Sequence, residues 1–388
     1  MSQDYVNPDY VAEPEKVNTK RGLEGSVIDI SSVSKVNAET NSLIYRGYPV
    51  QDLAENCKFE EVAYLMYKGE LPNATELATF EKLERSYRDI TKECLGVIKS
   101  LPKKCHPMDS IRTAVSFVGC EDERVWDATP ATNFDKAVRL LAKIPVMIAA
   151  DYRFKKGLDF IPPKSDLSLS ENFFNMCFGK VPAPEVVKAF DVSLILYAEH
   201  SFNASTFTSR VVTSTESDLY SATVAGIGAL KGPLHGGANE QVMHMMLEIA
   251  DPNKAADWMT NALAMKKKVM GFGHRVYKKG DSRVPTMKKY AQKMAEFIKE
   301  PKWMQMYDAL EQVMVDKKKI YPNLDFPAGP AYYMMGFEID FFTPIFVMAR
   351  TTGWSAHIME QAGNNRIIRP LSEYVGSAQR SVKPLSAR

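Results

Sequence analysis

The stretch Pro184-Glu-Val-Val-Lys-Ala-Phe-Asp-Val-Ser-Leu-Ile-Leu-Tyr-Ala-Glu199 has the pattern of a long helix. Val187, Phe190, Leu194 and Tyr197 recur every three or four residues, and Pro184 suits the first turn of a helix. Helical spacing continues through most of the chain after residue 48. Strands that alternate with helices, which would indicate a parallel sheet, do not occur. The sequence therefore predicts a large, mainly α-helical protein.

Three other predicted helices have recognisable ends. One begins at Phe59 and ends near Gly69, and residues 217–230, rich in Ala, Gly and Ser, predict a closely packed buried helix. Thr343 and Pro344 have the pattern of a cap followed by a first-turn proline, and this helix is expected to stop at Gly363.

The start of the chain differs from the rest. Ser26–Ile30 and Ser42–Tyr45 are short β-like pieces separated by glycines, so we expect a small N-terminal β element. Residues 1–21 are polar and mixed in charge, which is typical of a flexible tail.

The composition limits the classes of partner. The 388 residues are 45% hydrophobic and carry a formal net charge of +2, so neither nucleic acid nor a membrane surface is expected to bind. The five cysteines are odd in number and form no CxxC pair, which argues against a disulfide framework and a zinc site. The apolar runs are too short for a membrane span, and the acidic N-terminal residues do not fit a targeting peptide. We therefore expect a cytoplasmic protein.

His235 lies in the glycine-rich segment Gly232-Pro-Leu-His-Gly-Gly237, and a helical pattern follows from Ala238 to Ile249. The pattern places His235 at or just before a helix N-terminus, where the helix dipole disfavours a charged imidazolium. A neutral imidazole there can donate a hydrogen bond to an enolate oxygen. The alternative is a simple helix cap.

His274 lies in Gly271-Phe-Gly-His-Arg275, with lysines on both sides. The segment matches neither a Walker loop nor a dinucleotide fingerprint, but its glycines allow close approach of the backbone to a ligand. Together with the lysines it predicts binding of a phosphate-bearing ligand. The alternative is a solvated helix end.

Asp325 is flanked by Leu324 and Phe326, and apolar neighbours raise the pKa of a carboxylate and make it a better base. An ordinary turn aspartate is the alternative. Arg350 and Arg369 also have apolar neighbours and need an anionic partner. With Arg283 they could hold two carboxylates, although structural salt bridges compete with this interpretation.

Two histidines and one carboxylate are a minimal set for proton abstraction next to a carbonyl. The carboxylate takes the proton, one imidazole stabilises the enol, and the other polarises an electrophile. The remaining histidines His106, His244 and His357 are interpreted as hydrogen-bonded core or surface residues.

The chain carries eight segments in an order that resembles the citrate synthase family, including its short bacterial branch with the 2-methylcitrate synthases. The resemblance extends from about Gly22 to Pro370. The segments are Leu43–Gly47, Gly69–Pro72, Cys105–Asp109, Tyr197–Thr206, Lys231–Asn239, Gly271–His274, Pro322–Asp325 and Ala356–Gln361.

The resemblance implies a two-domain helical fold that forms a homodimer with shared active sites. A large domain would cover residues 22–236 and return at 337–388 with a C-terminal arm. A small domain would cover 237–336, and the cleft between the two would close on substrate.

The resemblance also implies roles for single residues. His235 would stabilise the enol, His274 would polarise the carbonyl of oxaloacetate, and Asp325 would remove a proton from the acyl-CoA. Further substrate contacts would come from Arg85, His200, Arg283, Arg350 and, from the partner subunit, Arg369. Coenzyme A would be bound by Lys268, Val269, Met270, Gly271, Phe272, Lys278 and Lys318. The reaction needs no metal and no cofactor beyond the acyl-CoA co-substrate.

The acyl donor stays open between propionyl-CoA and acetyl-CoA, because a pocket discriminates one methylene by only ~1–3 kcal/mol. The segments 197–206 and 364–370 resemble the methylcitrate branch, so we expect both activities, with a strict citrate synthase as the alternative. A non-catalytic helical protein that binds acyl-CoA or a di-acid is a different class. The joint presence of His235, His274 and Asp325 argues against that class.

Overall fold

The computed structural model describes residues 20–37, 39–274, 276–277, 280–377 and 379–388. Residues 1–19 of the predicted tail lie outside the described residues. The described chain divides into two units, Ser31–Ile367 and the terminal segments on either side of it.

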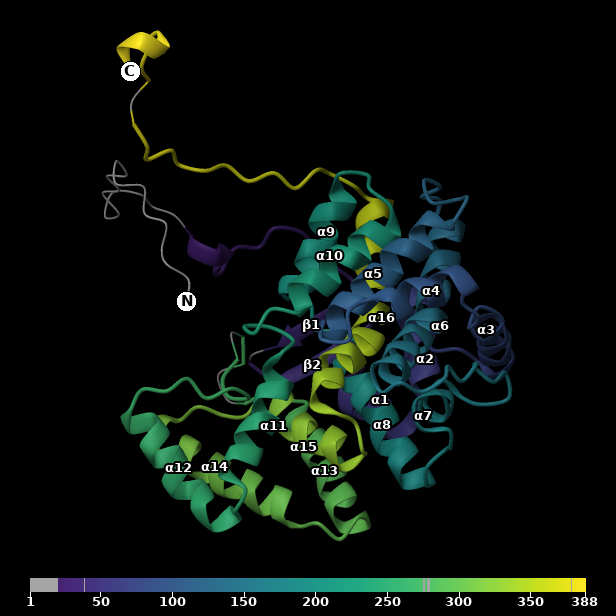
Figure 1. The fold of residues 1–388 in the computed structure, drawn as a ribbon, viewed down its shortest axis with the longest axis vertical. Coiled ribbons are helices and arrows are strands. Elements are labelled where there is room, and N and C mark those ends of the chain that lie inside the picture. Colours follow the sequence, from purple (N-terminus) through teal and green to yellow (C-terminus); the bar gives the residue numbers. More distant parts are fainter. Residues whose placement is uncertain (1–19, 38, 275, 278–279, 378) are drawn as a thin grey trace. The chain divides into compact units, whose positions relative to one another are not determined.

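Helices dominate the unit Ser31–Ile367, as Figure 1 shows. The prediction of a mainly α-helical fold is therefore confirmed. The described helices are α1 (Val50–Asn56), α2 (Phe59–Lys68), α3 (Ala74–Ser86), α4 (Lys92–Ser100), α5 (Pro107–Cys120), α6 (Pro130–Lys155), α7 (Leu169–Phe178), α8 (Pro184–Tyr197), α9 (Ala204–Ser214), α10 (Leu219–Leu230), α11 (Ala238–Ile249), α12 (Pro252–Ala264), α13 (Val284–Phe297), α14 (Lys302–Lys318), α15 (Asp325–Met334) and α16 (Phe342–Gly363).

The β element is a small antiparallel sheet in the order β1 (Ser34–Asn37), β2 (Ser42–Tyr45) and β3 (Tyr48–Pro49). Ser34 pairs with Tyr45 in its register. The predicted strand at Ser42–Tyr45 is confirmed, but the one at Ser26–Ile30 is wrong, because that segment has no strand structure. The apolar side chains of Ser26–Ile30 are exposed, whereas Leu43 and Tyr45 are fully buried. The strand therefore forms in the segment that can bury its side chains.

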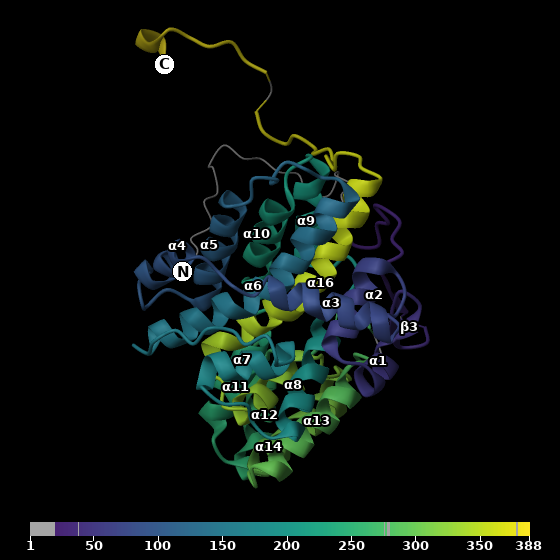
Figure 2. The ribbon, with the colours of Figure 1, turned by 90° about the vertical axis from the view of Figure 1, so that its right-hand side faces the viewer.

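Helix α16 is the centre of the core. Almost every side chain from Phe342 to Ile358 is buried, and the helix packs against α6, α8, α9 and α10. Figures 1 and 2 both show it beside α6 and α9. A helix that is buried on every side has to be enclosed by other elements.

The ends of α16 differ from the prediction by a few residues. The helix begins at Phe342, directly after a 3-10 turn at Ile339–Phe341, so Thr343 is inside the helix and is not its cap. The hydroxyl of Thr343 instead donates a hydrogen bond to Glu240 on α11. Gly363 is the last helical residue. The predicted end of α2 is confirmed, because Gly69 caps it with φ +94° in the left-handed region that glycine favours.

Helices α11 to α15 pack on one another, with α12 against α14 and both α11 and α13 against α15. This group contacts the rest of the unit through α13 on α8 and α11 on α16. These helices fall within residues 237–336, and the division of the chain into a large and a small domain at these bounds stays a prediction. The arrangement places the start of α15 against the end of α8.

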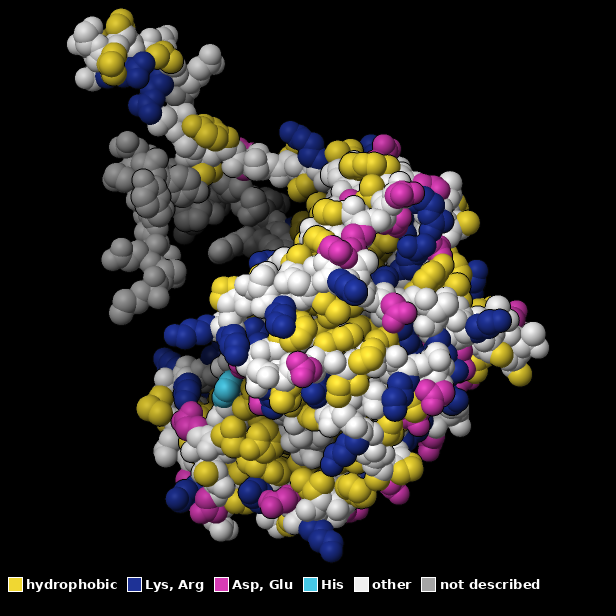
Figure 3. All heavy atoms as spheres, turned by 45° about the vertical axis from the view of Figure 1, so that its right-hand side comes forward, with side chains coloured by type: hydrophobic (Ala, Val, Ile, Leu, Met, Phe, Trp, Pro, Cys, Tyr) yellow, Lys and Arg dark blue, Asp and Glu magenta, His cyan; other side chains and the backbone are white. Residues whose placement is uncertain are grey.

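The surface mixes charges of both signs. On the face shown in Figure 3, basic and acidic side chains are interspersed with hydrophobic ones. Within the described residues, every helix is too short or too polar to cross a membrane.

Candidate active site

The predicted site residues converge on the C-terminal end of α8. The phenol of Tyr197 donates a hydrogen bond to Oδ1 of Asp325 across 2.7 Å. The main-chain oxygen of Tyr197 accepts from Nε of Arg350 at 2.8 Å. The oxygen of Leu196 accepts from Nη1 of Arg283 at 3.4 Å. One turn of helix therefore contacts three side chains from three distant segments.

Asp325 is the first residue of α15, and its N–H donates to Oδ1 of Asn323 at 3.1 Å. Burial raises the pKa of Asp325 to about 6, and the hydrogen bond from Tyr197 acts in the opposite direction. The predicted direction of this pKa shift is confirmed. A carboxylate with this pKa is ionised at neutral pH and is a stronger base than an exposed aspartate.

Main-chain hydrogen bonds join the loop that carries His274 to the segment before Asp325. The N–H of Gly273 donates to the oxygen of Tyr321 at 2.8 Å, and the N–H of Asn323 donates to that of Gly271 at 2.9 Å. Gly271 has φ +84°, and a Cβ there would lie 2.5 Å from Val242 and 2.9 Å from Phe326. Only glycine fits this position. The expected approach of this backbone to a ligand stays a prediction.

His235 lies three residues before α11, whose N-cap is Gly237. Its Nε2 is 2.8 Å from Oγ of Ser205 and accepts the N–H of Ser205 at 3.3 Å. Trp354 holds the same Oγ through Nε1 at 3.0 Å. Burial, and after it the charge of Arg350, lowers the pKa of His235 to about 3. The predicted neutral state is confirmed, but burial and Arg350 cause it, whereas the prediction invoked the helix dipole.

His274 is fixed in a similar way through its other nitrogen. Nδ1 accepts the N–H groups of Val276 at 3.0 Å and Tyr277 at 3.1 Å, which leaves Nε2 to carry the hydrogen. Its ring centroid lies 4.8 Å from that of His200. Burial, and then the charge of Arg283, lowers the pKa of His274 to about 4. His274 is therefore a neutral donor.

The two arginines of this cluster are buried but differ in their partners. Arg350 is 1% exposed, and burial lowers its pKa to about 10. Arg283 makes a two-armed ion pair with Asp281, with Nε–Oδ1 2.9 Å and Nη2–Oδ2 2.7 Å. The N–H of Leu324 also donates to Asp281 at 3.2 Å, so this carboxylate joins Arg283 to the start of α15. The charge of Arg283 is thus offset by Asp281, whereas Arg350 has no carboxylate ion pair among the described residues and could pair with an anionic group of a ligand.

The remaining predicted site residues have different surroundings. Arg85 pairs with Glu81 within α3 at 3.1 Å, and Arg369 is exposed in the terminal unit. Lys318 is the last residue of α14, and Lys268 precedes the His274 loop; both are exposed. Val269, Met270 and Phe272 are partly buried in that loop, and Lys278 lies outside the described residues.

Sequence reasoning missed Tyr197, Ser205 and Asp281. Tyr197 fits the apolar face of α8, and only its hydroxyl group could have indicated a polar partner. Ser205 and Asp281 lie inside or beside the segments that resemble the family, but no pattern showed which atoms they contact.

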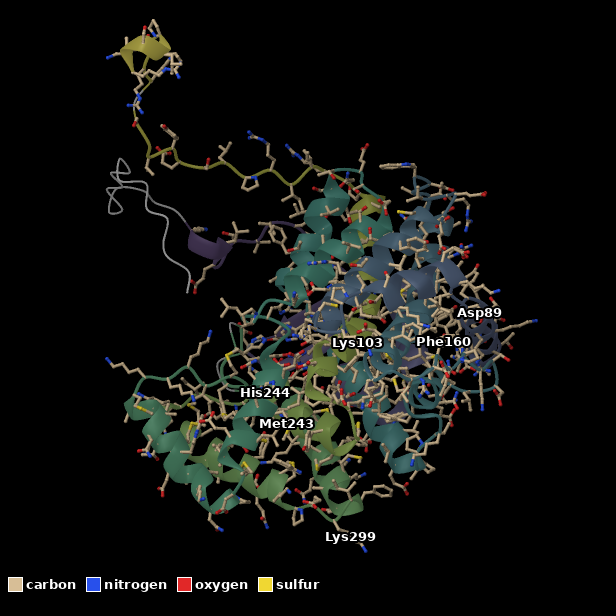
Figure 4. All side chains as sticks on the ribbon, in the orientation of Figure 1. Asp89, Lys103, Phe160, Met243, His244 and Lys299 are labelled. Atoms are coloured by element: carbon tan, nitrogen blue, oxygen red, sulfur yellow. The ribbon has the colours of Figure 1, made fainter. Side chains whose placement is uncertain are left out.

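The three remaining histidines have structural partners or face solvent, as predicted. His106 caps α5 through Nδ1, and His357 is buried with Nε2 3.0 Å from Glu199. His244 is exposed on α11 beside the buried Met243, and Figure 4 labels both. Within the described residues, no group of three or more His, Cys, Asp and Glu side chains is arranged to hold a metal ion.

Comparison with known proteins identifies the family of this chain. The family model described as "Citrate synthase, C-terminal domain" matches residues 22–371. A citrate synthase of Mycolicibacterium smegmatis is 56% identical over 95% of this chain and 98% of its own length. A 2-methylcitrate synthase of Mycobacterium tuberculosis is 55% identical over 94% and 93%. The structure of the ternary complex of carboxymethyl coenzyme A and oxaloacetate with citrate synthase from Thermoplasma acidophilum has a TM-score of 0.90 at 32% identity, covering 95% of this chain and 99% of that one.

This chain belongs to the citrate synthase family. It is an enzyme of the class that condenses an acyl-CoA with oxaloacetate.

Proposed function

We propose that the enzyme condenses propionyl-CoA or acetyl-CoA with oxaloacetate and hydrolyses the product thioester to release coenzyme A. The observation that carries the proposal is the cluster itself: an aspartate with a raised pKa and two neutral imidazoles, each fixed by main-chain N–H groups. The arrangement supplies one base and two neutral hydrogen-bond donors without any charged acid.

In the first step Asp325 takes a proton from the α-carbon of the acyl group. The developing negative charge moves to the thioester oxygen, where the N–H of His235 donates a hydrogen bond. His235 has its hydrogen on Nδ1, because Nε2 accepts from Ser205. Because the ring of His235 is neutral, it stabilises the enol through a hydrogen bond and does not protonate the base, Asp325.

In the second step the α-carbon attacks the ketone carbon of oxaloacetate, and a carbon–carbon bond forms. The ketone oxygen gains negative charge, Nε2–H of His274 polarises it through a hydrogen bond, and the oxygen finally takes up one proton, which balances the proton that Asp325 removed. Arg283 and Arg350, with His200, hold the two carboxylates. Water then attacks the thioester carbon, and the sulfur of coenzyme A leaves as the thiol.

Coenzyme A would lie along Lys268, Val269, Met270, Gly271 and Phe272. The left-handed turn at Gly271 packs the main chain closely against Val242 and Phe326, and Lys268 and Lys318 offer exposed charges for phosphates. Lys278 is part of the same proposal, as is Arg85 for the second substrate.

A homodimer in the cytoplasm completes the proposal. Helices α5 and α10 expose small and apolar side chains around a hollow of about 410 Å³, among them Thr113, Phe117 and Val224. Such a face suits helix packing against a second copy of the chain. All five cysteines are free, which fits a reducing compartment.

The test is thiol release from each acyl-CoA with and without oxaloacetate, compared by kcat/KM. We expect release from both donors only when oxaloacetate is present. Asp325→Asn should lower kcat by about 10²–10⁴-fold while KM for oxaloacetate stays near its original value. Asp316→Asn, an exposed carboxylate on α14, is the matched control and should leave kcat unchanged. Wild-type turnover in Asp325→Asn would show that another group is the base.

A further inference from the structure

Asn239 is a buried polar residue whose side chain has no evident structural role in the fold. It is the second residue of α11 and its exposed fraction is 0%. Neither Oδ1 nor Nδ2 makes a hydrogen bond to any described group. Buried amides are paired in most proteins, because an unpaired one costs free energy. An apolar side chain would be the ordinary choice at this position.

The surroundings of Asn239 connect it to the catalytic base. Helix α11 packs on α15, and a Cβ at Gly329 would lie only 2.9 Å from the main-chain oxygen of Asn239. Burial raises the pKa of Tyr197 well above its usual value, and the nearby amide of Asn239 acts in the opposite direction. The amide is therefore close to the phenol whose hydroxyl group contacts Asp325, although hydrogen-bonding geometry is not reached.

We propose that Asn239 is a positioning residue for the catalytic base, acting through Tyr197. In the substrate-bound enzyme, Nδ2 of Asn239 donates to the phenolic oxygen, and the phenol in turn donates to Oδ1 of Asp325. The inference rests on the proposed function, because it assumes that Asp325 removes the proton.

The order of the two hydrogen bonds explains why an amide would be kept here. A phenol can donate one hydrogen bond and can also accept. When Asn239 occupies the accepting side, the single hydrogen of Tyr197 is directed to Asp325, and this bond favours the ionised carboxylate. A neutral donor achieves this without adding a charge next to the two arginines.

The competing account is that Asn239 only packs against α15. Asn239→Leu separates the two accounts, because leucine has a similar size and no polar atoms. The positioning role predicts that kcat falls about tenfold, that KM for oxaloacetate is unchanged, and that the acidic limb of the kcat–pH profile moves to higher pH. The melting temperature should stay the same or rise, since an unpaired amide is removed. If Asn239 only packs against α15, Asn239→Leu should change the melting temperature and leave the acidic limb of the kcat–pH profile at the same pH.

Asn175→Leu is the matched control. Asn175 on α7 is also buried, and its Nδ2 also lacks a partner among the described groups, but it lies outside the site. Its substitution should leave both kcat and the acidic limb unchanged. If Asn239→Leu does not fold, Asn239→Asp replaces it: a carboxylate would accept from Tyr197 and compete with Asp325, so the limb should again move to higher pH.

A double-mutant cycle with Tyr197→Phe completes the test. Because Asn239 acts through the hydroxyl group of Tyr197, Asn239→Leu should have no further effect on kcat in the Tyr197→Phe enzyme. Additive losses, a change confined to KM, or an unmoved pH limb in Asn239→Leu would each overturn the proposal. Asp325→Asn is measured in parallel. If it kept wild-type kcat, the proposed function of Asp325 would fail; if it were inactive while Asn239→Leu behaved as wild type, only the role of Asn239 would fail.

Discussion

The main-chain N–H of Ser205 donates to Nε2 of His235 across 3.3 Å. A peptide N–H can only donate, so Nε2 is an acceptor and the hydrogen of the neutral ring is on Nδ1. His274 has the opposite arrangement, because two main-chain N–H groups donate to its Nδ1. The protein thus fixes one nitrogen of each ring as an acceptor and leaves the hydrogen on the other nitrogen.

This relationship predicts the protonation of both histidines. Their pKa values are lowered to about 3 and about 4, so both rings should stay neutral from pH 8 down to pH 5. Nitrogen NMR of histidine-labelled enzyme should show the hydrogen on Nδ1 of His235 and on Nε2 of His274 throughout this range. The exposed His244 is an internal comparison in the same spectra. A midpoint near 6.5 for His235 or His274 would contradict the prediction.

Buried arginines with different partners should behave differently when replaced. Arg350 makes no ion pair with a carboxylate among the described residues, whereas Arg88 pairs with the buried Glu84 at 2.8 Å. Arg350→Leu should therefore raise KM for oxaloacetate about a hundredfold, from the loss of about 2–5 kcal/mol of binding, with a small effect on stability. Arg88→Leu should leave KM unchanged and cost about 3–5 kcal/mol of stability, because it leaves a carboxylate unpaired. Steady-state kinetics and denaturant unfolding of both variants measure the contrast, and an unchanged KM in Arg350→Leu would exclude it from the oxaloacetate site.

The sequence predicted the helical fold and the members of the cluster because both depend on local patterns. Helical spacing reports which face is buried, and His235, His274 and Asp325 lie in short segments with unusual glycines or prolines. Tyr197, Asn239 and Ser205 could not be assigned in this way. Their roles depend on contacts between segments far apart in the chain, such as the 128 residues between Tyr197 and Asp325.

The errors in the elements have a similar cause. Ser26–Ile30 has the composition of a strand, but strand formation needs a partner and a surface to bury against, and neither can be seen locally. Thr343 is a good cap by its type, yet its hydroxyl group is used by Glu240, more than a hundred residues earlier in the chain.

A buried carboxylate away from the site predicts a pH-dependent stability. Asp191 on α8 accepts hydrogen bonds from the N–H of Phe59 at 3.1 Å and the hydroxyl of Ser170 at 2.8 Å. Burial, and then the charge of Glu60, raises its pKa to about 7. Since an unfolded aspartate titrates near pH 3.9, the folded state holds an extra proton between about pH 4 and 7, and stability falls as pH rises through this window.

Asp191→Asn should remove this loss of stability at rising pH. The variant should be more stable than the wild type at pH 8, by about 1–3 kcal/mol, and should show no such gain at pH 4, where Asp191 is protonated in the folded wild type. Thermal unfolding at the two pH values measures the difference. Asp257→Asn, at an exposed position on α12, is the control without a pH-dependent effect. An equal effect of Asp191→Asn at both pH values would show that the charge of Asp191 is not the cause.

Arg369 allows a test of the proposed shared active site. It is an exposed arginine in the terminal segment after Ile367, and the family resemblance implies that it serves the partner subunit. A two-fold dimer gives both subunits the same reciprocal contact, so a substitution at Arg369 would damage the site of the other chain. Asp325, in contrast, is proposed to serve the site of its own chain.

Subunit complementation distinguishes the two arrangements. Arg369→Ala and Asp325→Asn chains, each nearly inactive as homodimers, are mixed after dissociation and allowed to reassemble. If Arg369 acts across the interface, one site of every heterodimer carries both faults and the other carries neither, so about half of the heterodimer sites should be active by symmetry. If Arg369 acts within its own subunit, each heterodimer site carries one fault and activity stays low. Heterodimers isolated with two different affinity tags give the measurement, and their inactivity would place Arg369 in the site of its own chain.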